Sequence, residues 1–404
     1  MPERIETVVV GGGQAGLAVS FLLTQRGREH VVLERGRIGE TWRTRCWDGF
    51  RLNTPNWTLD LPGRPYSGPE PDAFGTAADL LDYLEDYAGA FKAPVRLGVE
   101  ATRLDATNGT LRVVTGEGTF EAENVVVASG AFQVPHAPEF APSRELHLHA
   151  NDYRRPEDLP EGAVLVVGSG QSGCQIGEEL VRAGRRVYLC VGRCPWAPRR
   201  YRGLDIIRWL IDIGLMDQTV EELPSPDAVL ACNPTLTGND DGHECNPLTL
   251  EAEGAILAGR LERLENGRAQ FANDVNKNLA KGLEFVANLI SRCDAYVGRP
   301  GPASPGSNQA TVGPRAKRDV VRKLDLAREG VGTVLFATGY RPDYSWIDLP
   351  VIGGDGRPRQ RRGVTDVPGL YFVGLHWLHK RKSALLLGVR EDAEHVVDHL
   401  AGER

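Results

Sequence analysis

The sequence predicts an α/β fold with two Rossmann-like dinucleotide-binding domains of the three-layer ββα/αβα type. Three observations predict it. A glycine-rich turn joins an apolar strand to a helix within residues 7–25, the same pattern returns within residues 163–183, and the length of 404 residues exceeds what one hydrophobic core usually supports. Short apolar runs alternate with amphipathic stretches along the chain, which is typical of sheets covered by helices.

The first fingerprint spans residues 7–34 in the order strand, glycine turn, helix, strand, acid. Gly11 permits the tight turn, Gly13 lets the backbone approach a pyrophosphate, and Gly16 lets helix and strand pack closely. The unpaired N–H groups of the helix N-terminus attract phosphate, and Glu34 is placed to accept hydrogen bonds from a ribose. Cofactor contacts are expected from Gly11, Gly13, Gln14, Ala15, Gly16, Glu34, Arg35, Thr41, Trp42, Val99 and Ala128.

The amino-acid composition limits the classes of partner that we expect for this protein. The chain is 41% hydrophobic and 25% charged, as in an ordinary globular protein, and its net charge of -7 argues against nucleic acid as a partner. The seven cysteines are scattered and form neither a disulfide framework nor a zinc pattern, so no metal is expected. Neither a secretory signal nor an apolar run of roughly 18 residues is found, so we expect a cytoplasmic protein without a membrane partner.

The segment after the first fingerprint is rich in tryptophan and proline. Residues 42–65 predict either a rigid wall whose aromatic faces suit a planar ring or a well-packed surface loop. A helix is expected over 74–91, strands over 95–104 and 110–114, and a buried strand over 125–130.

The second fingerprint repeats the first, with a strand at Ala163–Val167, a helix over 171–183 and a strand over 186–191. It ends in Arg193 rather than an acid. Because arginine accommodates the 2′-phosphate of NADP, NADPH is the expected ligand; the alternative is that the arginines line a solvated loop. Contacts are expected from Gly168, Gly170, Gln171, Ser172, Gly173, Arg193, Arg199 and Arg200.

The remaining chain supplies helices over 206–213 and 279–297 and a Pro/Gly/Ser loop over 298–314 that is expected to be mobile. His243 lies near two cysteines, but their spacing matches no zinc template.

Short apolar strands are expected over 333–340 and 369–374, with a closing helix over 383–400. They carry no fingerprint of their own, so we expect them to complete the first domain. The expected domains are therefore 1–155, then an inserted NADPH domain over 156–325 with a mobile loop near 298–318, then 326–404.

The complete set of motifs resembles a known family. Two fingerprints, Gly39–Trp42, Phe336–Tyr340 and Leu370–Gly374 together look like class B flavin-containing monooxygenases, specifically the small bacterial flavoproteins related to plant indole-3-pyruvate monooxygenases of the YUCCA type. The resemblance covers nearly the whole chain. It implies FAD in the first site, NADPH in the second, and further cofactor contacts from Thr338, Gly339 and Gly374.

The resemblance also implies catalytic residues. His149 and Tyr153 match the second half of the family's linker motif, whereas Ser143 and Glu145 stand where the motif has Phe and Gly. The Tyr153 ending favours heteroatom oxygenation over Baeyer-Villiger chemistry, and a satisfied interdomain histidine is the structural alternative for His149. Asn53 falls where many members place an asparagine beside the flavin; otherwise it is a turn residue.

The expected activity is NADPH- and O2-dependent monooxygenation of a small molecule through a C4a-(hydro)peroxyflavin, by N- or S-oxygenation or by oxidative decarboxylation of a 2-oxo acid. A flavin reductase or electron-transfer flavoprotein without oxygen insertion is the alternative, and a nucleotide-sensing protein a third interpretation. A disulfide reductase needs a cysteine pair at the flavin, which Cys46 lacks. A homodimer is left open.

A basic turn follows the last strand. Residues 376–382 hold three consecutive cations and two histidines in a chain of negative net charge. An arginine here would clamp a carboxylate beside an apolar face, whereas a solvated basic loop is the ordinary interpretation. The candidate substrate residues are Trp377, Arg381 and Lys382.

Overall fold

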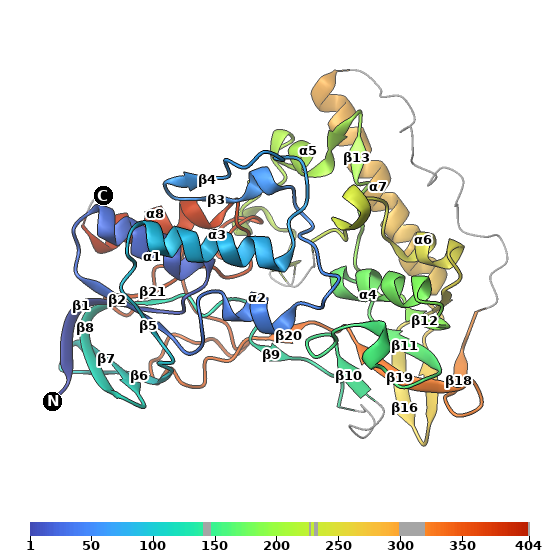
Figure 1. Cartoon of the computed structure of the whole chain (residues 1–404), viewed down its shortest axis with the longest axis horizontal. Helices are drawn as coiled ribbons and strands as arrows, with labels where there is room; N and C mark the ends of the chain where they lie inside the picture. The colour runs from blue at the N-terminus through green and yellow to red at the C-terminus, as the bar shows by residue number, and fades with distance from the viewer. Residues whose placement is uncertain (140–146, 226–227, 230–232, 299–319, 403–404) are drawn as a thin grey trace.

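A computed structural model describes residues 1–139, 147–225, 228–229, 233–298 and 320–402. Two α/β units lie beside each other, the first drawn in blue, teal and red and the second in green, yellow and orange (Figure 1). The first is built on a mixed sheet, in which parallel strands continue into an antiparallel meander, and the second on a parallel sheet, so the predicted fold class is confirmed.

The first unit contains a seven-stranded sheet. Its strands are β1 (Glu3–Val10), β2 (His30–Glu34), β5 (Val95–Leu97), β6 (Ala101–Thr107), β7 (Thr110–Thr115), β8 (Gly118–Val127) and β21 (Leu370–Phe372). Its helices are α1 (Gln14–Gln25), α2 (Glu40–Arg45), α3 (Ala77–Ala90) and α8 (Val389–Leu400). The short pairs β3 (Asp60–Leu61) with β4 (Arg64–Pro65) and β9 (Val134–Pro135) with β20 (Tyr340–Arg341) lie outside this sheet.

The sheet runs in the order β5-β2-β1-β8-β7-β6, and β21 also pairs with β8. The first half of β8 pairs antiparallel with β7 and its second half pairs parallel with β21. The sequence predicts the apolar run over 125–130 as a strand of its own. The structure corrects this prediction, because one continuous ten-residue strand pairs with β7 and then β21 on one side and with β1 on the other.

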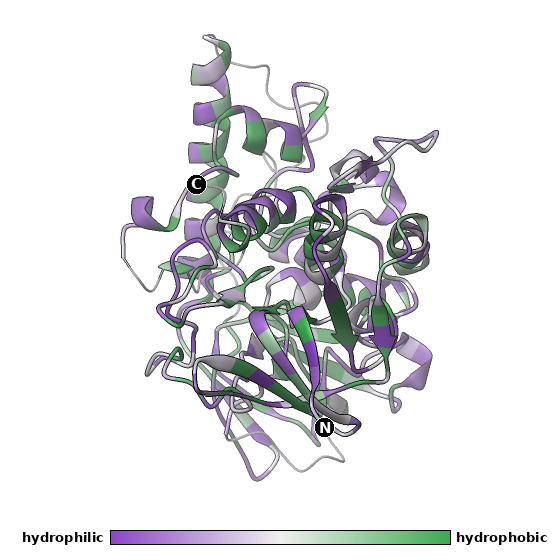
Figure 2. Cartoon of the chain, turned by 90° about the vertical axis from the view of Figure 1, so that its left-hand side faces the viewer, coloured by the Kyte–Doolittle hydropathy of each residue, from purple (hydrophilic) through white to green (hydrophobic). Residues whose placement is uncertain are grey.

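The two faces of the sheet are buried in different ways. Val9, Val32 and Val126 pack with the residues of α1, α3 and α8. Their neighbours Val8 and Val31 share a cluster with residues of the β6–β7–β8 meander. Because successive side chains of a strand point to opposite faces, the all-apolar strands of the fingerprint require cover on both sides. Apolar residues accordingly concentrate in the strands (Figure 2).

The second unit repeats this architecture around a five-stranded parallel sheet of order β10-β19-β11-β12-β15, covered by helices and by the meander β16–β17–β18. Its strands are β10 (His147–His149), β11 (Ala163–Val167), β12 (Val187–Cys190), β15 (Ile256–Ala258), β16 (Leu261–Glu265), β17 (Arg268–Phe271), β18 (Lys323–Asp325) and β19 (Val331–Phe336). The helices are α4 (Gln171–Arg182), α5 (Ile206–Asp212), α6 (Pro247–Ala252) and α7 (Val275–Val297), and a small hairpin joins β13 (Arg200–Tyr201) to β14 (Leu204–Asp205).

The strand assignment at the domain boundaries needs a correction. The sequence predicts that the strand over 333–340 completes the first domain, but β19 lies between β10 and β11 in the second sheet. β10 joins the same sheet, although it lies before the expected boundary at 155. An apolar strand fits the centre of either parallel sheet, so its composition did not decide its partner. The later elements β21 and α8 return to the first unit, and Tyr344, Ile347 and Val351 also pack against its meander.

The expected mobile loop near 298–318 lies outside the described residues except for Gly298, which ends α7. Among the described helices, none is long and apolar enough to cross a membrane.

Candidate active site

The first glycine turn has the geometry that a phosphate site requires. Gly11 has a φ of 117°, and a Cβ added there would lie 2.5 Å from the carbonyl oxygen of Ala128. A Cβ at Gly16 would overlap the carbonyl oxygen of Gly11. A Cβ at Gly13 would meet nothing within 4 Å, so this position faces open space. Two glycines therefore serve packing, and the third leaves room for a ligand.

The N-terminus of α1 begins beside this open position. Gly13 is its N-cap and no side chain caps the helix, so its first N–H groups are available to an anion. Gln14 is fixed from both sides: its amide donates to the carbonyl of Ala384 at 2.9 Å and accepts from the Trp42 indole at 3.3 Å. Gly374 has a φ of 78°, and a Cβ there would lie 2.5 Å from the Cβ of Ala15, so the C-terminal segment packs against the turn.

Glu34 ends β2 beside the glycine turn and is buried. Its carboxylate accepts from Gly12 N at 2.6 Å and from Gly36 N at 2.8 Å, which leaves further lone pairs for ligand hydroxyl groups. Val99 N donates to the Glu34 carbonyl at 3.0 Å and supports the strand end. Two further candidate residues, Arg35 and Thr41, are exposed on the segment that follows.

The second turn reproduces the first. A Cβ at Gly168 would lie 2.5 Å from the carbonyl oxygen of Ala337, and one at Gly173 would overlap the Gly168 carbonyl. At Gly170 an added Cβ would meet only the Cys194 sulfur at 3.6 Å, an ordinary contact. Gly170 is the N-cap of α4 and no side chain caps that helix. Gln171 bonds to Leu236 through its side chain, and Ser172 is half-buried in the first turn.

The end of the second strand differs from Glu34 in chemistry. Val191 occupies the corresponding place and is buried, so an apolar side chain stands where the first unit has a carboxylate. Ser169 Oγ instead accepts from Gly192 N at 2.9 Å. Next to it lies a cavity of about 260 Å³. The cavity is lined by Arg193, Arg260, Asp274, Lys277, Asn278 and Lys281.

This cavity is strongly cationic, with four basic side chains and one acid. Asp274 is already engaged, because its carboxylate accepts from the Arg260 guanidinium at 2.6 Å. Burial raises the pKa of Asp274, but the bonds from Arg260 outweigh this effect and hold the pKa below its usual value. Lys277 and Lys281 come from successive turns of α7. A phosphate group beside the second turn therefore meets a concentration of positive charge.

The sequence analysis did not identify Arg260, Lys277 and Lys281, because these cations lie outside the second fingerprint. The predicted helix began at residue 279, one turn too late, and Lys277 precedes that start. The i,i+4 spacing of Lys277 and Lys281 indicates a binding site only when the first turn of the helix is known to lie beside the end of β12. Arg260 follows β15, the neighbour of β12 in the sheet, which only the strand order reveals.

Arg199 and Arg200 do not belong to this cavity, which corrects their predicted role. Arg199 is 2% exposed and its guanidinium pairs with both carboxylate oxygens of Asp205. Arg200 donates to the carbonyl oxygens of Gly242 and Asp241. Trp196 and Ala197, which lie between β12 and β13, are also buried.

The candidate catalytic residues differ in whether other parts of the protein already bind their polar side-chain atoms. The Asn53 side chain is half-buried and has no hydrogen bond to any described residue. The turn is held instead by Asn56, which accepts from Gly75 N at 2.9 Å and donates to the Glu70 carbonyl at 3.0 Å. The turn-residue alternative therefore describes Asn56 rather than Asn53.

His149 and Tyr153 are satisfied within the protein. His149 Nε2 donates to the Gly339 carbonyl at 3.1 Å, Nδ1 accepts from Asn151 N at 3.0 Å, and burial lowers the pKa of the ring. The neutral ring thus holds the turn of Thr338 and Gly339 in place. Tyr153 is fully buried, donates to Glu179, and has its pKa raised by burial. Tyr153 cannot touch a substrate there, which corrects its assignment as catalytic.

The two candidate cations of the basic turn after β21 differ in the charge of their partners. Lys382 lies 2.8 Å from Asp217 and 2.6 Å from Glu391, so its charge is neutralised and its predicted substrate role is corrected. Arg381 has neutral partners among the described residues, the amide oxygens of Gln218 at 3.0 Å and Asn233 at 3.4 Å.

Burial and the neighbouring Arg292 lower the pKa of Arg381. Its Nε and the Nε1 of the buried Trp377 lack hydrogen-bond partners, and the guanidinium lies 4.7 Å from the centre of the Trp377 ring. Buried donors without partners are costly, so this pair favours an anionic or accepting ligand.

Five cysteines among the described residues are free thiols. Burial raises the pKa of Cys46 to about 12, and it likewise raises that of Cys174, Cys190 and Cys245. Burial raises the pKa of Cys293 to about 11. Thiols of this kind stay protonated at neutral pH and are poor redox nucleophiles. The described groups of His, Cys, Asp and Glu include none that could hold a metal ion.

Comparisons with known proteins agree with these features. Residues 8–211 match a family model described as pyridine nucleotide-disulphide oxidoreductase. The chain is 32% identical to an uncharacterized CzcO-like oxidoreductase of Geobacillus kaustophilus, over 99% of both chains. It is 31% identical to a probable indole-3-pyruvate monooxygenase, YUCCA1, of Arabidopsis thaliana, over 98% of this chain and 89% of the relative. The fold is similar to a flavin-containing monooxygenase of Stenotrophomonas maltophilia, with a TM-score of 0.68 and 20% identity over 99% of both chains.

Proposed function

This chain belongs to the pyridine nucleotide-disulphide oxidoreductase family, in the branch of the flavin monooxygenases, and on that premise we propose that it is an NADPH- and O2-dependent monooxygenase of a small anionic molecule. It is an oxidoreductase that uses FAD and NADPH. One observation carries the proposal: two glycine turns of equal geometry end in opposite charges, Glu34 in the first unit and the cationic cavity beside Arg193 in the second.

We assign FAD to the first turn. The open position at Gly13 and the uncapped N-terminus of α1 fit a pyrophosphate, and the buried carboxylate of Glu34 fits ribose hydroxyl groups. Bound FAD supplies the redox chemistry of hydride acceptance and oxygen activation. The side chains of the protein position this group and shield it from water.

NADPH is assigned to the second turn. The missing acid at Val191 and the four cations favour a ribose that carries a 2′-phosphate over one with a free hydroxyl group. In this arrangement His149 acts through the Thr338–Gly339 turn, which it holds by a hydrogen bond. The side-chain amide of Asn53 supplies a donor without a titratable proton, and such a donor stabilises negative charge without protonating it.

The substrate class follows from Arg381. Its guanidinium is held between two amide oxygens and the face of Trp377, and it keeps an unpartnered buried N–H. A carboxylate or a similar anion is the ligand that a guanidinium fork recognises best. N-oxygenation, S-oxygenation and oxidative decarboxylation of a 2-oxo acid all remain compatible with an anionic substrate.

The test uses reduction and reoxidation of the purified protein. NADPH is added without oxygen, the bleaching of the flavin is followed, and the reduced enzyme is then mixed with oxygen without substrate. A monooxygenase reoxidises in two phases and releases hydrogen peroxide slowly. A flavin reductase or electron-transfer flavoprotein reoxidises in one rapid phase, which would contradict the proposal. Oxygen uptake with anionic amines, thioethers and 2-oxo acids then identifies the substrate.

A further inference from the structure

Arg199 is a buried cation at the contact between the two units. It stands immediately before β13 of the second unit, and its Nη1 donates to the carbonyl oxygen of Asn53 in the first unit at 2.9 Å. The same nitrogen donates to the carbonyl oxygen of Thr237 at 3.3 Å. A single guanidinium therefore joins the backbone beside the Asn53 side chain to a loop of the second unit.

The position of Arg199 is fixed by neighbours from both units. Asp205 accepts from its Nη2 at 2.5 and 2.6 Å and also caps α5 by accepting from Ile207 N at 2.8 Å. The Phe74 ring of the first unit lies 4.8 Å from the guanidinium. Burial lowers the pKa of Arg199 although Asp205 opposes this. Removing one member of such a pair leaves an uncompensated buried charge.

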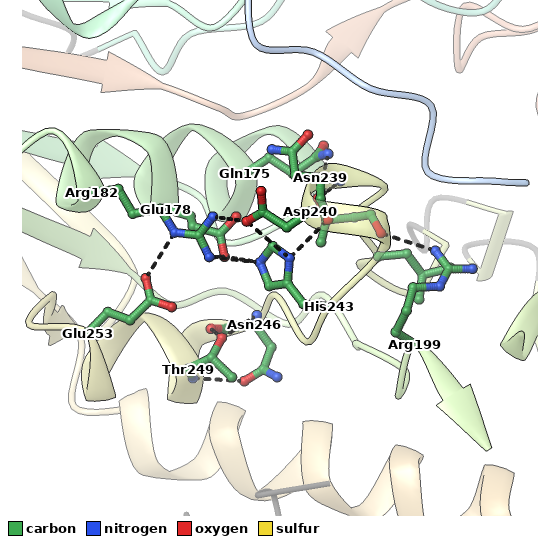
Figure 3. A network of polar contacts seen from close by, with 12 residues as sticks. Gln175, Glu178, Arg182, Arg199, Asn239, Asp240, His243, Asn246, Thr249 and Glu253 are labelled. Carbon is green, nitrogen blue, oxygen red and sulfur yellow. Dashed lines mark hydrogen bonds and ion pairs between the residues drawn. The ribbon is translucent and has the colours of Figure 1, made fainter. Parts of the chain in front are cut away.

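The loop that contains Thr237 is held against α4 by two polar contacts. His243 Nε2 lies 2.5 Å from Glu178 and Arg182 lies 2.6 Å from Asp240, so the loop is tied to the helix that begins at the second glycine turn (Figure 3). On its other side, a Cβ at Gly238 would overlap the carbonyl oxygen of Leu52. The segment that precedes Asn53 is therefore in direct contact with this loop.

We propose that Arg199 is a positioning residue that fixes the Asn53 segment relative to the NADPH-binding unit. It acts on Asn53 only through the backbone carbonyl, so the side-chain amide stays available beside the flavin. This step rests on the proposed function, in which Asn53 stabilises negative charge at the flavin. Loss of the bond allows the segment to move and water to enter, and more NADPH is then consumed in forming hydrogen peroxide.

The test measures motion and chemistry separately in Arg199→Lys, because a lysine keeps the charge but not the fork that reaches both Asn53 and Asp205. Hydrogen–deuterium exchange of a peptide over residues 50–56 reports the motion; Leu52 N and Asn56 N are bonded there in the folded protein. Exchange is expected to rise roughly tenfold. Peroxide formed from NADPH and oxygen without substrate is expected to rise several-fold, with FAD content and the rate of anaerobic reduction unchanged.

Arg155→Ala is the matched control. Arg155 is 56% exposed and also pairs across the two units, with Asp48 at 3.7 Å, but it has no bond to the Asn53 segment. It should change neither exchange nor peroxide release. Asp205→Asn keeps the side-chain volume and weakens the hold on Arg199, so the same two measurements on this variant decide the question if Arg199→Lys does not fold.

Unchanged exchange over 50–56 in a folded Arg199→Lys or Asp205→Asn protein would overturn the proposal. Raised exchange with unchanged peroxide release also overturns the functional part, provided that Asn53→Ala raises peroxide release. If Asn53→Ala has no effect either, the role of Asn53 in the proposed function fails, while raised exchange still supports the hold that Arg199 exerts on the segment.

Discussion

The side-chain amide of Asn278 donates to the carbonyl oxygen of Val191 at 3.0 Å, and this bond ties the first turn of α7 to the end of β12. Val191 stands where the first unit has Glu34, so the bond brings the lysines of α7 to the position from which an acid is missing. The cationic cavity therefore depends on an element that is far away in the chain.

Replacing Lys277 and Lys281 together by glutamine should weaken NADPH binding roughly tenfold or more, since each contact to a phosphate contributes about 1.5–3 kcal/mol when well formed and less when exposed. NADH binding should not change, because NADH has no 2′-phosphate. Anaerobic flavin reduction at several concentrations of each nucleotide measures both. Lys92→Gln, an exposed lysine of the first unit, is the control. An equal loss for both nucleotides would contradict the assignment.

Arg193→Ala should show the same selective loss, and Arg199→Lys should not. The first side chain lines the cavity, whereas the second is buried with Asp205. Comparing the ratio of NADPH to NADH efficiency in the two variants separates phosphate contact from a general effect on folding. A loss of preference for NADPH in Arg199→Lys alone would restore the role that its sequence position suggested.

Gly13→Ala should reduce the content of bound FAD, because a methyl group would occupy the open space that a pyrophosphate needs. The apoprotein should nevertheless fold, since the added Cβ meets no protein atom within 4 Å. Gly16→Ala should instead destabilise the fold itself, because its Cβ overlaps the Gly11 carbonyl. The absorbance ratio of flavin to protein, together with circular dichroism, distinguishes the two. Full flavin content in Gly13→Ala would refute the first assignment.

Arg381→Ala should raise the KM of an anionic substrate roughly tenfold while leaving anaerobic flavin reduction by NADPH unchanged, as expected when a ground-state contact is removed. Arg381→Lys should restore part of the loss, because the charge remains but the fork does not. Arg359→Ala, at an exposed arginine of the first unit, is the control. Preferred turnover of neutral or cationic amines, with Arg381→Ala indifferent, would show that the substrate is not an anion.

The contribution of His243 to stability should depend on pH. The hydrogen bond to Glu178 raises the pKa of His243 above its usual value of about 6.5, despite burial. A group whose pKa is raised on folding stabilises the protein fully below the pKa of the unfolded chain, and this stabilisation disappears as pH rises through the folded pKa.

His243→Gln should therefore lower the melting temperature at pH 5.5–6, by an amount equivalent to roughly 1 kcal/mol, and less at pH 8.5. Thermal unfolding at several pH values measures the difference between variant and native protein. His376→Gln, a histidine without a bond to Glu178, is the comparison. A gap that is constant or widens with increasing pH would contradict the raised pKa.

Local patterns in the sequence determined the two fingerprints, the helices that follow them and the family. The glycine roles at Gly11 and Gly16 hold in the structure because a turn with a positive φ and a close backbone approach are local requirements that the residue type itself reveals. The preference for NADPH followed in the same way from the missing acid at the end of the second strand.

Only the tertiary structure decided which of the cationic side chains are available to bind a ligand. Arg193, Arg199 and Arg200 are equivalent in the sequence, as are Arg381 and Lys382, yet Asp205 neutralises Arg199 and two acids neutralise Lys382. The partners come from distant segments, and the strand order that brings Arg260 and α7 to the cavity is likewise a non-local property. A side chain's chemistry is fixed by its residue type, but its availability depends on which charges the fold places beside it.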